Sequence, residues 1–291
     1  MTRATFPRPA MQALLALVLL LAASCAAPPP PARPAPPDTA GPEAARLRDA
    51  MLAEVPGAAI PPPAQADRWI ELAREALIAA GQRPEGAELA VLADRAPSVQ
   101  RIALLLLRAE RPWEVLAAAP AATGQSGRRG YFITPTGVYV NDGTIPGYRA
   151  LGTRNAQGIR GLGAQGMRVW DFGWVWAPRG WAEDGSEAEI RFLLHATDPD
   201  ILEPRLGRPG SQGCVRIGGA MNRFLDRHGV LDAELERIAA RDERTAALLP
   251  PDRTPTRLAG RMLIVVDSAA PRVPAARMAQ ARPGDAPGCA G

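Results

Sequence analysis

The sequence predicts a mainly β domain over residues 87–270, preceded by a small helical segment. From Ala87 onward, short apolar runs follow one another at close spacing and are separated by Pro and Gly, a pattern typical of a β-sandwich or barrel. Apolar residues make up 47% of the chain and charged residues 22%. This composition can build a packed core, so wholesale disorder is excluded.

The chain begins with the features of a bacterial export signal, which we assign to residues 1–24. Arg3 and Arg8 precede the uncharged apolar run Met11–Ala23, and small residues follow it. The run is too short to span a bilayer, so we expect a cleaved signal rather than a permanent transmembrane helix.

Cys25 directly follows Ala-Ala-Ser and resembles the acylated cysteine of a lipobox, which predicts a lipid anchor in the membrane. The match departs from the usual lipobox at Ala22, where Leu is common. Ordinary signal cleavage near Ser24 or Ala26 is the alternative. In both cases we expect the protein in the periplasm or cell envelope.

Proline marks the next boundary, and we predict a proline-rich linker over residues 25–66. Seven of the ten residues from Pro28 to Pro37 are proline, and Pro61–Pro63 forms a second run. Such a segment favours extended structure and can act as a semi-rigid spacer, although a tether without fixed reach is an equal alternative. A short helix over Glu43–Glu54 is expected between the two runs.

A helical appendage is predicted over residues 67–86. The stretch Asp67–Ala80 carries Trp69, Ala73 and Leu77 at helical spacing, which predicts one buried face. Nothing in this segment suggests chemistry, so we expect a structural role.

Several apolar runs of the β domain are predicted strands. They are Leu89–Ala93, Val99–Leu107, Trp113–Ala119, Tyr131–Ile133, Gly137–Val140, Arg168–Trp170, Glu189–His195 and Met262–Val266. One helix, Ala220–His228, is expected among them and ends at Gly229. Residues 271–291 show little apolar periodicity and are predicted to be a disordered tail.

The charge balance and the cysteine count exclude several classes of protein. All 34 basic residues are Arg and 30 residues are acidic, so the net charge is +4, or +2 once the two Arg of residues 1–24 are removed. This mild excess does not favour nucleic-acid binding. Three Cys in 291 residues cannot form a disulfide framework, and with two His they leave few candidate nucleophiles, bases or soft metal ligands.

Two of these scarce residues can form a catalytic pair. His195 ends an apolar run, and Cys214 follows 19 positions later, after a Pro- and Gly-rich loop that can fold back. An imidazole that takes the proton of a thiol makes the Cys a nucleophile. Gly213 lets the backbone approach a substrate carbonyl closely, and neighbouring N–H groups can stabilise an oxyanion.

The spacing of these residues leaves other interpretations open. A Cys in an apolar strand is usually a small buried hydrophobic residue, and a lone His usually makes only a hydrogen bond. A zinc site is a third possibility, but His195, Cys214 and His228 lack the usual spacing of zinc ligands.

The surrounding motifs resemble the catalytic domain of the L,D-transpeptidase (YkuD-type) family. His195 is followed after a loop by Ser-Gln-Gly-Cys-Val-Arg-Ile over residues 211–217, which is similar to the family pattern S-x-G-C-[IV]-R. Upstream, Thr-Pro-Thr-Gly-Val-Tyr over residues 134–139 and Ala-Thr-Gly over residues 122–124 resemble two further family motifs. The resemblance implies a YkuD-like β-sandwich over residues 87–270, with a short helix after the Cys.

The resemblance also implies a reaction without metal or organic cofactor. Members of the family cleave a peptidoglycan tetrapeptide stem after its third residue, release D-Ala and pass the acyl group to an amine of a neighbouring stem. The product is a 3→3 cross-link in the cell wall. In this chain Cys214 would form the thioester, and His195 would act as base and then as acid.

Further roles follow from the same resemblance. The backbone carbonyl of Ala196 would orient the His195 ring, and the N–H groups of Gly213 and Cys214 would form the oxyanion hole. Residues expected to bind the substrate or to shape its site are Ser211, Gln212, Arg216, Trp174 and Trp176. Ser211 would alternatively brace the loop, Arg216 would either bind a stem carboxylate or bridge the loop internally, and the Trp residues would form a wall over the cleft or pack into the core. Many family members carry His at the position of Gln212.

Two rival functions remain at the level of the sequence. If water intercepts the thioester, the protein is an L,D-carboxypeptidase, or an endopeptidase that trims cross-links. A protein that keeps the fold without catalysis would be a wall-binding lipoprotein. The expected partners are peptidoglycan stem peptides and, through the lipid on Cys25, a membrane.

Overall fold

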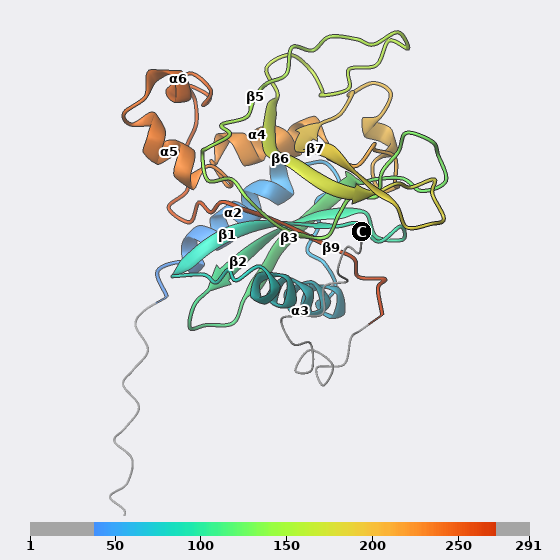
Figure 1. Cartoon of the computed structure of the whole chain (residues 1–291). Helices are drawn as coiled ribbons and strands as arrows, with labels where there is room; N and C mark the ends of the chain where they lie inside the picture. The colour runs from blue at the N-terminus through green and yellow to red at the C-terminus, as the bar shows by residue number, and fades with distance from the viewer. Residues whose placement is uncertain (1–37, 272–291) are drawn as a thin grey trace, which may run out of the picture. The chain divides into compact units, whose positions relative to one another are not determined.

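The computed structural model describes residues 38–271, and Thr39 begins a compact unit (Figure 1). The predicted export signal, the lipidation site at Cys25 and the tail from residue 272 lie outside the described residues. Among residues 38–271, no helix combines the length and apolar character needed to cross a membrane.

One nine-stranded mixed sheet forms the centre of the described chain, with the strand order β4-β9-β1-β2-β3-β8-β7-β6-β5. The strands are β1 (Ala87–Asp94), β2 (Arg101–Arg108), β3 (Glu114–Ala122), β4 (Gly137–Val140), β5 (Tyr148–Arg149), β6 (Arg168–Pro178), β7 (Glu187–Ala196), β8 (Val215–Ile217) and β9 (Met262–Val266). Only the β1–β9 and β7–β8 pairs are parallel. The mainly β prediction is confirmed.

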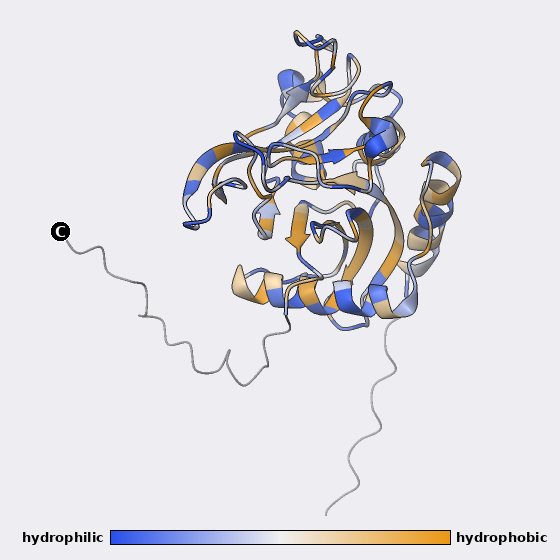
Figure 2. Ribbon diagram, turned by 90° about the vertical axis from the view of Figure 1, so that its right-hand side faces the viewer, coloured by the Kyte–Doolittle hydropathy of each residue, from blue (hydrophilic) through white to orange (hydrophobic). Residues whose placement is uncertain are grey.

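The central strands are apolar on both faces because a helix covers each side. In β2, Ile102, Leu104 and Leu106 belong to the core that contains helix α2 (Gly41–Glu54). The alternate residues of β2 belong to a second core beneath helix α3 (Pro63–Ala79). A strand buried on both faces needs a continuous apolar run, which explains the sequence Ile-Ala-Leu-Leu-Leu-Leu. Figure 2 shows these strands as hydrophobic, beside a helix of mixed hydropathy.

Helix α2 corrects the predicted boundary of the proline-rich linker. The linker was expected to reach residue 66, but α2 buries Ala44, Leu47 and Met51 in the main core. The helix itself matches the expected stretch Glu43–Glu54. The folded unit therefore starts well before residue 67, because an amphipathic helix between two proline runs is long enough to pack on the sheet.

Helix α3 is a structural layer of the domain rather than an appendage. Pro63 occupies its first turn, where the missing N–H costs no hydrogen bond. Trp69, Ala73 and Leu77 are buried against the sheet as their spacing predicts. The Trp69 indole N–H also donates to the buried Asp94 carboxylate at 2.7 Å, which ties α3 to the end of β1.

The sheet curls so that its two halves enclose one core. β3 joins the halves: it pairs with β2 along most of its length and with β8 through Ala121 and Ala122. Trp170, Phe192 and Val215 of the second half share the main core with α2 and the first half. The core is thus continuous around a single curled sheet.

Several elements differ from the sequence predictions. Residues Tyr131–Ile133 are not a strand and make only the isolated bridge Phe132–Arg179. Strand β6 continues to Pro178 beyond the expected end at Trp170, because a register shift after Asp171 lets it keep pairing with β7. The predicted helix Ala220–His228 is confirmed as α4 (Gly219–Arg227). Helices α5 (Ala233–Ala239) and α6 (Glu243–Ala246) and the 3-10 turn η1 (Glu203–Arg205) were not predicted.

Candidate active site

The parallel pairing of β7 with β8 brings the two candidate catalytic residues to one face of the sheet. The register aligns Leu194 with Val215 and His195 with Arg216. Because side chains alternate along a strand, Leu194 and Val215 point into the main core, and His195 and Arg216 point to the opposite face. Cys214 precedes Val215 and packs with Leu193 on that same opposite face.

The His195 ring is held by one short hydrogen bond. Its Nδ1 lies 2.6 Å from the carbonyl oxygen of Ala196, and the side chain is only 3% exposed. A carbonyl oxygen can only accept, so Nδ1 carries the proton and Nε2 keeps its lone pair. Ala196 therefore fixes the ring orientation and the tautomer.

Burial sets the charge state of this base. It lowers the pKa of His195 from 6.5 to about 4, against the opposing effect of the Ala196 hydrogen bond and with a further lowering by the Arg216 charge. The imidazole is accordingly neutral at neutral pH, which is the form that can accept a proton.

Cys214 lies on the same face of the sheet as this neutral imidazole. It is partly buried against the cluster of Ala150, Val169 and Leu193, and its Sγ lies 3.6 Å from the Arg191 carbonyl oxygen, to which the thiol donates. Burial raises the pKa of Cys214, while the Leu193 N–H and the Arg216 charge lower it. The thiol therefore needs a base when it attacks, and a resting thiolate–imidazolium pair is not favoured.

The loop before Cys214 is fixed by hydroxyl groups. Thr134 Oγ1 accepts from the Gly124 N–H at 2.8 Å and donates to the Gly213 carbonyl oxygen at 2.7 Å. The Ser211 hydroxyl accepts from the Gly213 N–H at 3.0 Å and donates to the Cys214 carbonyl oxygen. Ser211 is fully buried, so it braces the loop and does not face a substrate.

These bonds correct the expected oxyanion hole. Of the two expected donors, the Gly213 N–H already donates to the Ser211 hydroxyl. The Cys214 N–H has no hydrogen-bond partner within residues 38–271. The position of Gly213 requires glycine for two reasons. Its φ of +121° is a backbone conformation that favours glycine, and a Cβ there would lie 2.5 Å from the Ile190 side chain.

A cleft of about 850 Å³ borders the loop that carries Cys214, although neither Cys214 nor His195 lines it. Gln212, which is exposed, and Arg216 line it, together with Thr197 from the end of β7. Arg216 donates to the Gly210 carbonyl oxygen at 2.9 Å, so it bridges the loop and still borders the cleft. Both roles considered for Arg216 are compatible with this position.

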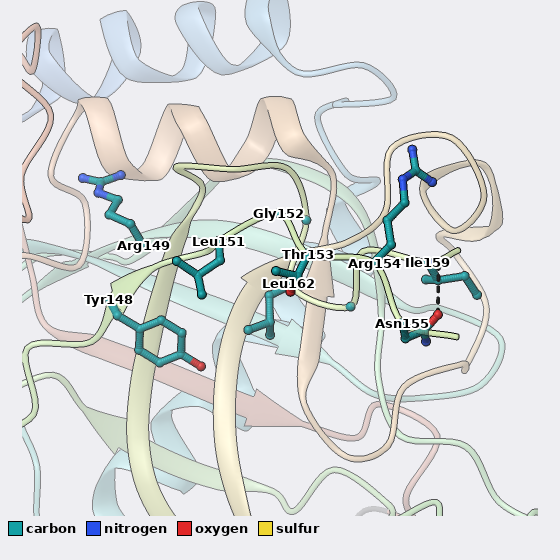
Figure 3. Close-up of a pocket in the computed structure, with 11 residues that line it drawn as sticks. Tyr148, Arg149, Leu151, Gly152, Thr153, Arg154, Asn155, Ile159 and Leu162 are labelled. Carbon is teal, nitrogen blue, oxygen red and sulfur yellow. Dashed lines mark hydrogen bonds between the residues drawn. The ribbon is translucent and has the colours of Figure 1, made fainter. Parts of the chain in front are cut away.

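A second pocket of about 560 Å³ is lined by residues between Tyr148 and Gly163, mostly in the segment between β5 and β6 (Figure 3). Tyr148, Leu151 and Leu162 border it, whereas Arg149 points away and pairs with Asp226. Residues 155, 159 and 161 line this pocket and the larger cleft. The segment between β5 and β6 therefore borders both hollows.

Sequence reasoning missed this segment. The signal was present: residues 150–167 contain five Gly, no strand pattern and no helical periodicity, and loops of this length inside a compact domain are often functional. Its position is fixed by Arg160, whose N–H donates to the buried Asp198 carboxylate at 2.8 Å.

The tryptophans divide into two groups. Trp170 is buried and donates to Asp232 at 3.1 Å, and Trp181 packs edge-on against Phe132. Trp174 and Trp176 are 64% and 62% exposed on the outer face of β6, and neither lines one of the two hollows. The expected wall over the cleft is thus not formed by these side chains.

His228 and metal binding complete the inventory of the site. His228 caps the C-terminal end of α4, where its ring packs against Phe224, and it takes no part in the Cys214 site. Within the described part of the chain, no cluster of three or more His, Cys, Asp or Glu side chains could hold a metal ion.

Comparison with models of known protein families finds no match for this chain, and no curated protein matches it in sequence. The functional interpretation consequently rests on the geometry around Cys214 and on the motifs that surround it.

Proposed function

We propose that this chain is a cysteine-dependent acyltransferase of the L,D-transpeptidase type, which forms 3→3 cross-links between peptidoglycan stem peptides. One observation carries the proposal: His195 and Cys214 lie on the same face of adjacent parallel strands, with Nδ1 of His195 bound to the Ala196 carbonyl oxygen. A neutral imidazole with a free Nε2 beside a partly buried thiol suits nucleophilic catalysis.

The first half-reaction forms a thioester. Nε2 of His195 takes the Cys214 proton while Sγ bonds to the carbonyl carbon of the donor peptide. The Cys214 N–H is the donor best placed to stabilise the oxyanion, because the Gly213 N–H already donates to the Ser211 hydroxyl. The carbon–nitrogen bond then breaks, and His195 returns the proton to the departing D-Ala amine.

The second half-reaction transfers the acyl group. An amine of a neighbouring stem gives a proton to Nε2 and attacks the thioester, the carbon–sulfur bond breaks, and the sulfur recovers the proton from His195. No group outside the two peptides and these side chains is needed to balance either step.

The finer structural and cellular assignments belong to the same proposal. The curled sheet with a helix directly after Cys214 is compatible with a YkuD-like sandwich. The predicted export signal and predicted lipidation at Cys25 support this proposal, because they would put the reaction at the cell envelope, where stem peptides occur.

Intact-mass spectrometry of the purified chain with a stem tetrapeptide, or with a carbapenem, tests the proposal. We expect an adduct on the wild type and none on Cys214→Ala. His195→Gln should slow adduct formation at least 100-fold, which is typical for loss of a general base, whereas His228→Gln should react normally. An unmodified Cys214 in the wild type with both reagents would argue strongly against an acyltransferase.

The products separate transfer from hydrolysis. Incubation with the tetrapeptide alone should yield 3→3 dimers, and accumulation of tripeptides without dimers would favour a carboxypeptidase.

A further inference from the structure

The 850 Å³ cleft that borders the Cys214 loop has a strongly one-sided charge. Four of its lining residues are arginines, namely Arg128, Arg205, Arg208 and Arg216, and none is Asp or Glu. They come from three separate segments, so the fold and not a local run of sequence gathers the charge. A cleft lined by one sign of charge concentrates counter-ions of the opposite sign.

The inner end of the cleft contains polar atoms without partners. Thr197 is 1% exposed, and its hydroxyl has no hydrogen-bond partner in the described chain. The buried Nε of Arg216, on the neighbouring strand, also lacks one. Buried polar groups are nearly always paired in folded proteins, so an acceptor on a bound ligand is the missing partner that fits both atoms.

The outer rim consists of exposed guanidinium groups. Arg205 and Arg208 lie in the loop between β7 and β8, and the guanidinium of Arg128 stacks 4.4 Å from the centre of the Tyr131 ring. None of the three has a carboxylate partner within residues 38–271.

The carboxylates in the loop between β7 and β8 have partners other than the rim arginines, and Asp200 pairs with Arg160 at 3.2 Å. Glu203 accepts from the Gly219 N–H at 3.0 Å, and Asp198 accepts from backbone N–H groups that include those of Arg160 and Ile201. The guanidinium N–H groups of the rim are thus not engaged by these carboxylates and can donate to a ligand.

We propose that this cleft binds the free carboxylates of the donor peptide, whose acyl group is transferred to Cys214. The protein therefore selects donor stem peptides with carboxylates over those with carboxamides. This inference rests on the proposed transferase function. Arg216 follows Cys214 by two residues on the same face of the sheet, so a group bound to Arg216 would lie roughly 7 Å along the chain from Cys214. Arginine binds carboxylates in two-pronged, charge-assisted contacts that an amide cannot replace.

The remaining lining favours a peptide over a nucleic acid. Amide side chains at Gln125, Gln157 and Gln212 can pair with peptide backbone groups, whereas Tyr131 is the sole aromatic residue lining the cleft. Binding of single-stranded nucleic acid usually needs several aromatic faces for stacking.

Equilibrium binding to the full chain carrying Cys214→Ala tests the inference without turnover. The probes are two fluorescent stem tetrapeptides of one sequence, one with free carboxylates and one with its side carboxylates converted to carboxamides. We expect about tenfold tighter binding of the carboxylate form, as for one good charged contact. Arg205→Gln/Arg208→Gln should reduce this preference to about twofold at most, and high salt should weaken it.

The matched control is Arg241→Gln, an exposed arginine on the turn after α5 that lies outside the cleft and should keep the full preference. Equal binding of both peptides by the parent protein would overturn the inference, even if the wild type forms the thioester. Selective binding without any thioester would support the cleft assignment while defeating the transferase. Tighter binding of a single-stranded oligonucleotide than of either peptide, lost in Arg205→Gln/Arg208→Gln, would overturn the assignment to peptides.

Discussion

His195 shows how a single backbone contact and burial together set the chemistry of a side chain. The Ala196 carbonyl oxygen fixes the proton on Nδ1, and burial keeps the ring neutral. The same burial that prepares the base also stores a dependence of stability on pH, because the folded ring resists protonation and the unfolded ring does not.

We expect acid to destabilise the protein through this residue. The folded pKa of His195 is about 4 and its ordinary value is 6.5, so the unfolded chain binds the extra proton between these pH values. Stability from neutral His195 is complete above pH 6.5 and is lost as pH falls toward 4, by roughly 3 kcal/mol. Urea denaturation of wild type and His195→Gln at pH 7 and pH 4 measures this, and an equal loss in both proteins would contradict it.

Gly213 illustrates a backbone requirement at the same scale. Gly213→Ala should destabilise the protein and abolish adduct formation, because it combines a φ of +121° with a Cβ placed 2.5 Å from Ile190. Gly207→Ala is the matched control: its φ is +94°, but no atom lies within 4 Å of the added Cβ.

Both alanines carry a backbone cost of about 1 kcal/mol, and only Gly213→Ala adds a clash. Thermal denaturation and intact-mass detection of the adduct provide the two readouts. A normal adduct in Gly213→Ala would show that the loop tolerates a side chain.

At the scale of elements, the short strand β8 depends on its neighbours. All three of its residues pair with β7, two of them also pair with β3, and helix α4 starts soon after it. Asn222 of α4 then bonds both backbone groups of Arg168 in β6, which fixes the helix across the sheet. The loop that carries Cys214 is consequently held at both ends by long-range contacts.

Helix α2 should contribute to stability as a core element. Met51 is fully buried, so Met51→Ala should lower the free energy of unfolding by about 2–5 kcal/mol. Glu54→Gln on the exposed end of the same helix should change it by no more than about 0.5 kcal/mol. Chemical denaturation measures both free energies of unfolding. Equal small effects would indicate that residues 41–54 act as a linker and not as part of the core.

At the scale of the whole molecule, the proposed function requires a location at the cell envelope as well as a folded site. The sequence predicts export and acylation at Cys25, and the folded unit begins at Thr39. The segment between them is short, so a lipid on Cys25 would keep the domain close to the membrane.

We therefore expect the full-length protein to incorporate radiolabelled palmitate in a bacterial host and to sediment with membranes. Cys25→Ala should lose both properties, while Cys289→Ala should keep them. Unlabelled wild-type protein in the soluble periplasmic fraction would point to ordinary signal cleavage.

Most strands, the helices α2, α3 and α4, and the choice of His195 and Cys214 as candidate residues can be predicted from the amino-acid sequence. These signals are local: the alternation or continuity of apolar residues and the chemistry of two scarce side chains need no knowledge of distant contacts. Short elements such as β5, α5 and α6 were missed because tertiary packing, not local pattern, stabilises them.

The relative positions of these elements and side chains depend on tertiary contacts and cannot be read from local sequence patterns. The tertiary structure placed α2 in the core, gave the Gly213 N–H to Ser211 and turned Trp174 and Trp176 to solvent. It also gathered four arginines from three segments into one cleft. The physical reason is common to all: each outcome depends on which residues far apart in the chain meet, and curling the sheet around one core fixes those meetings.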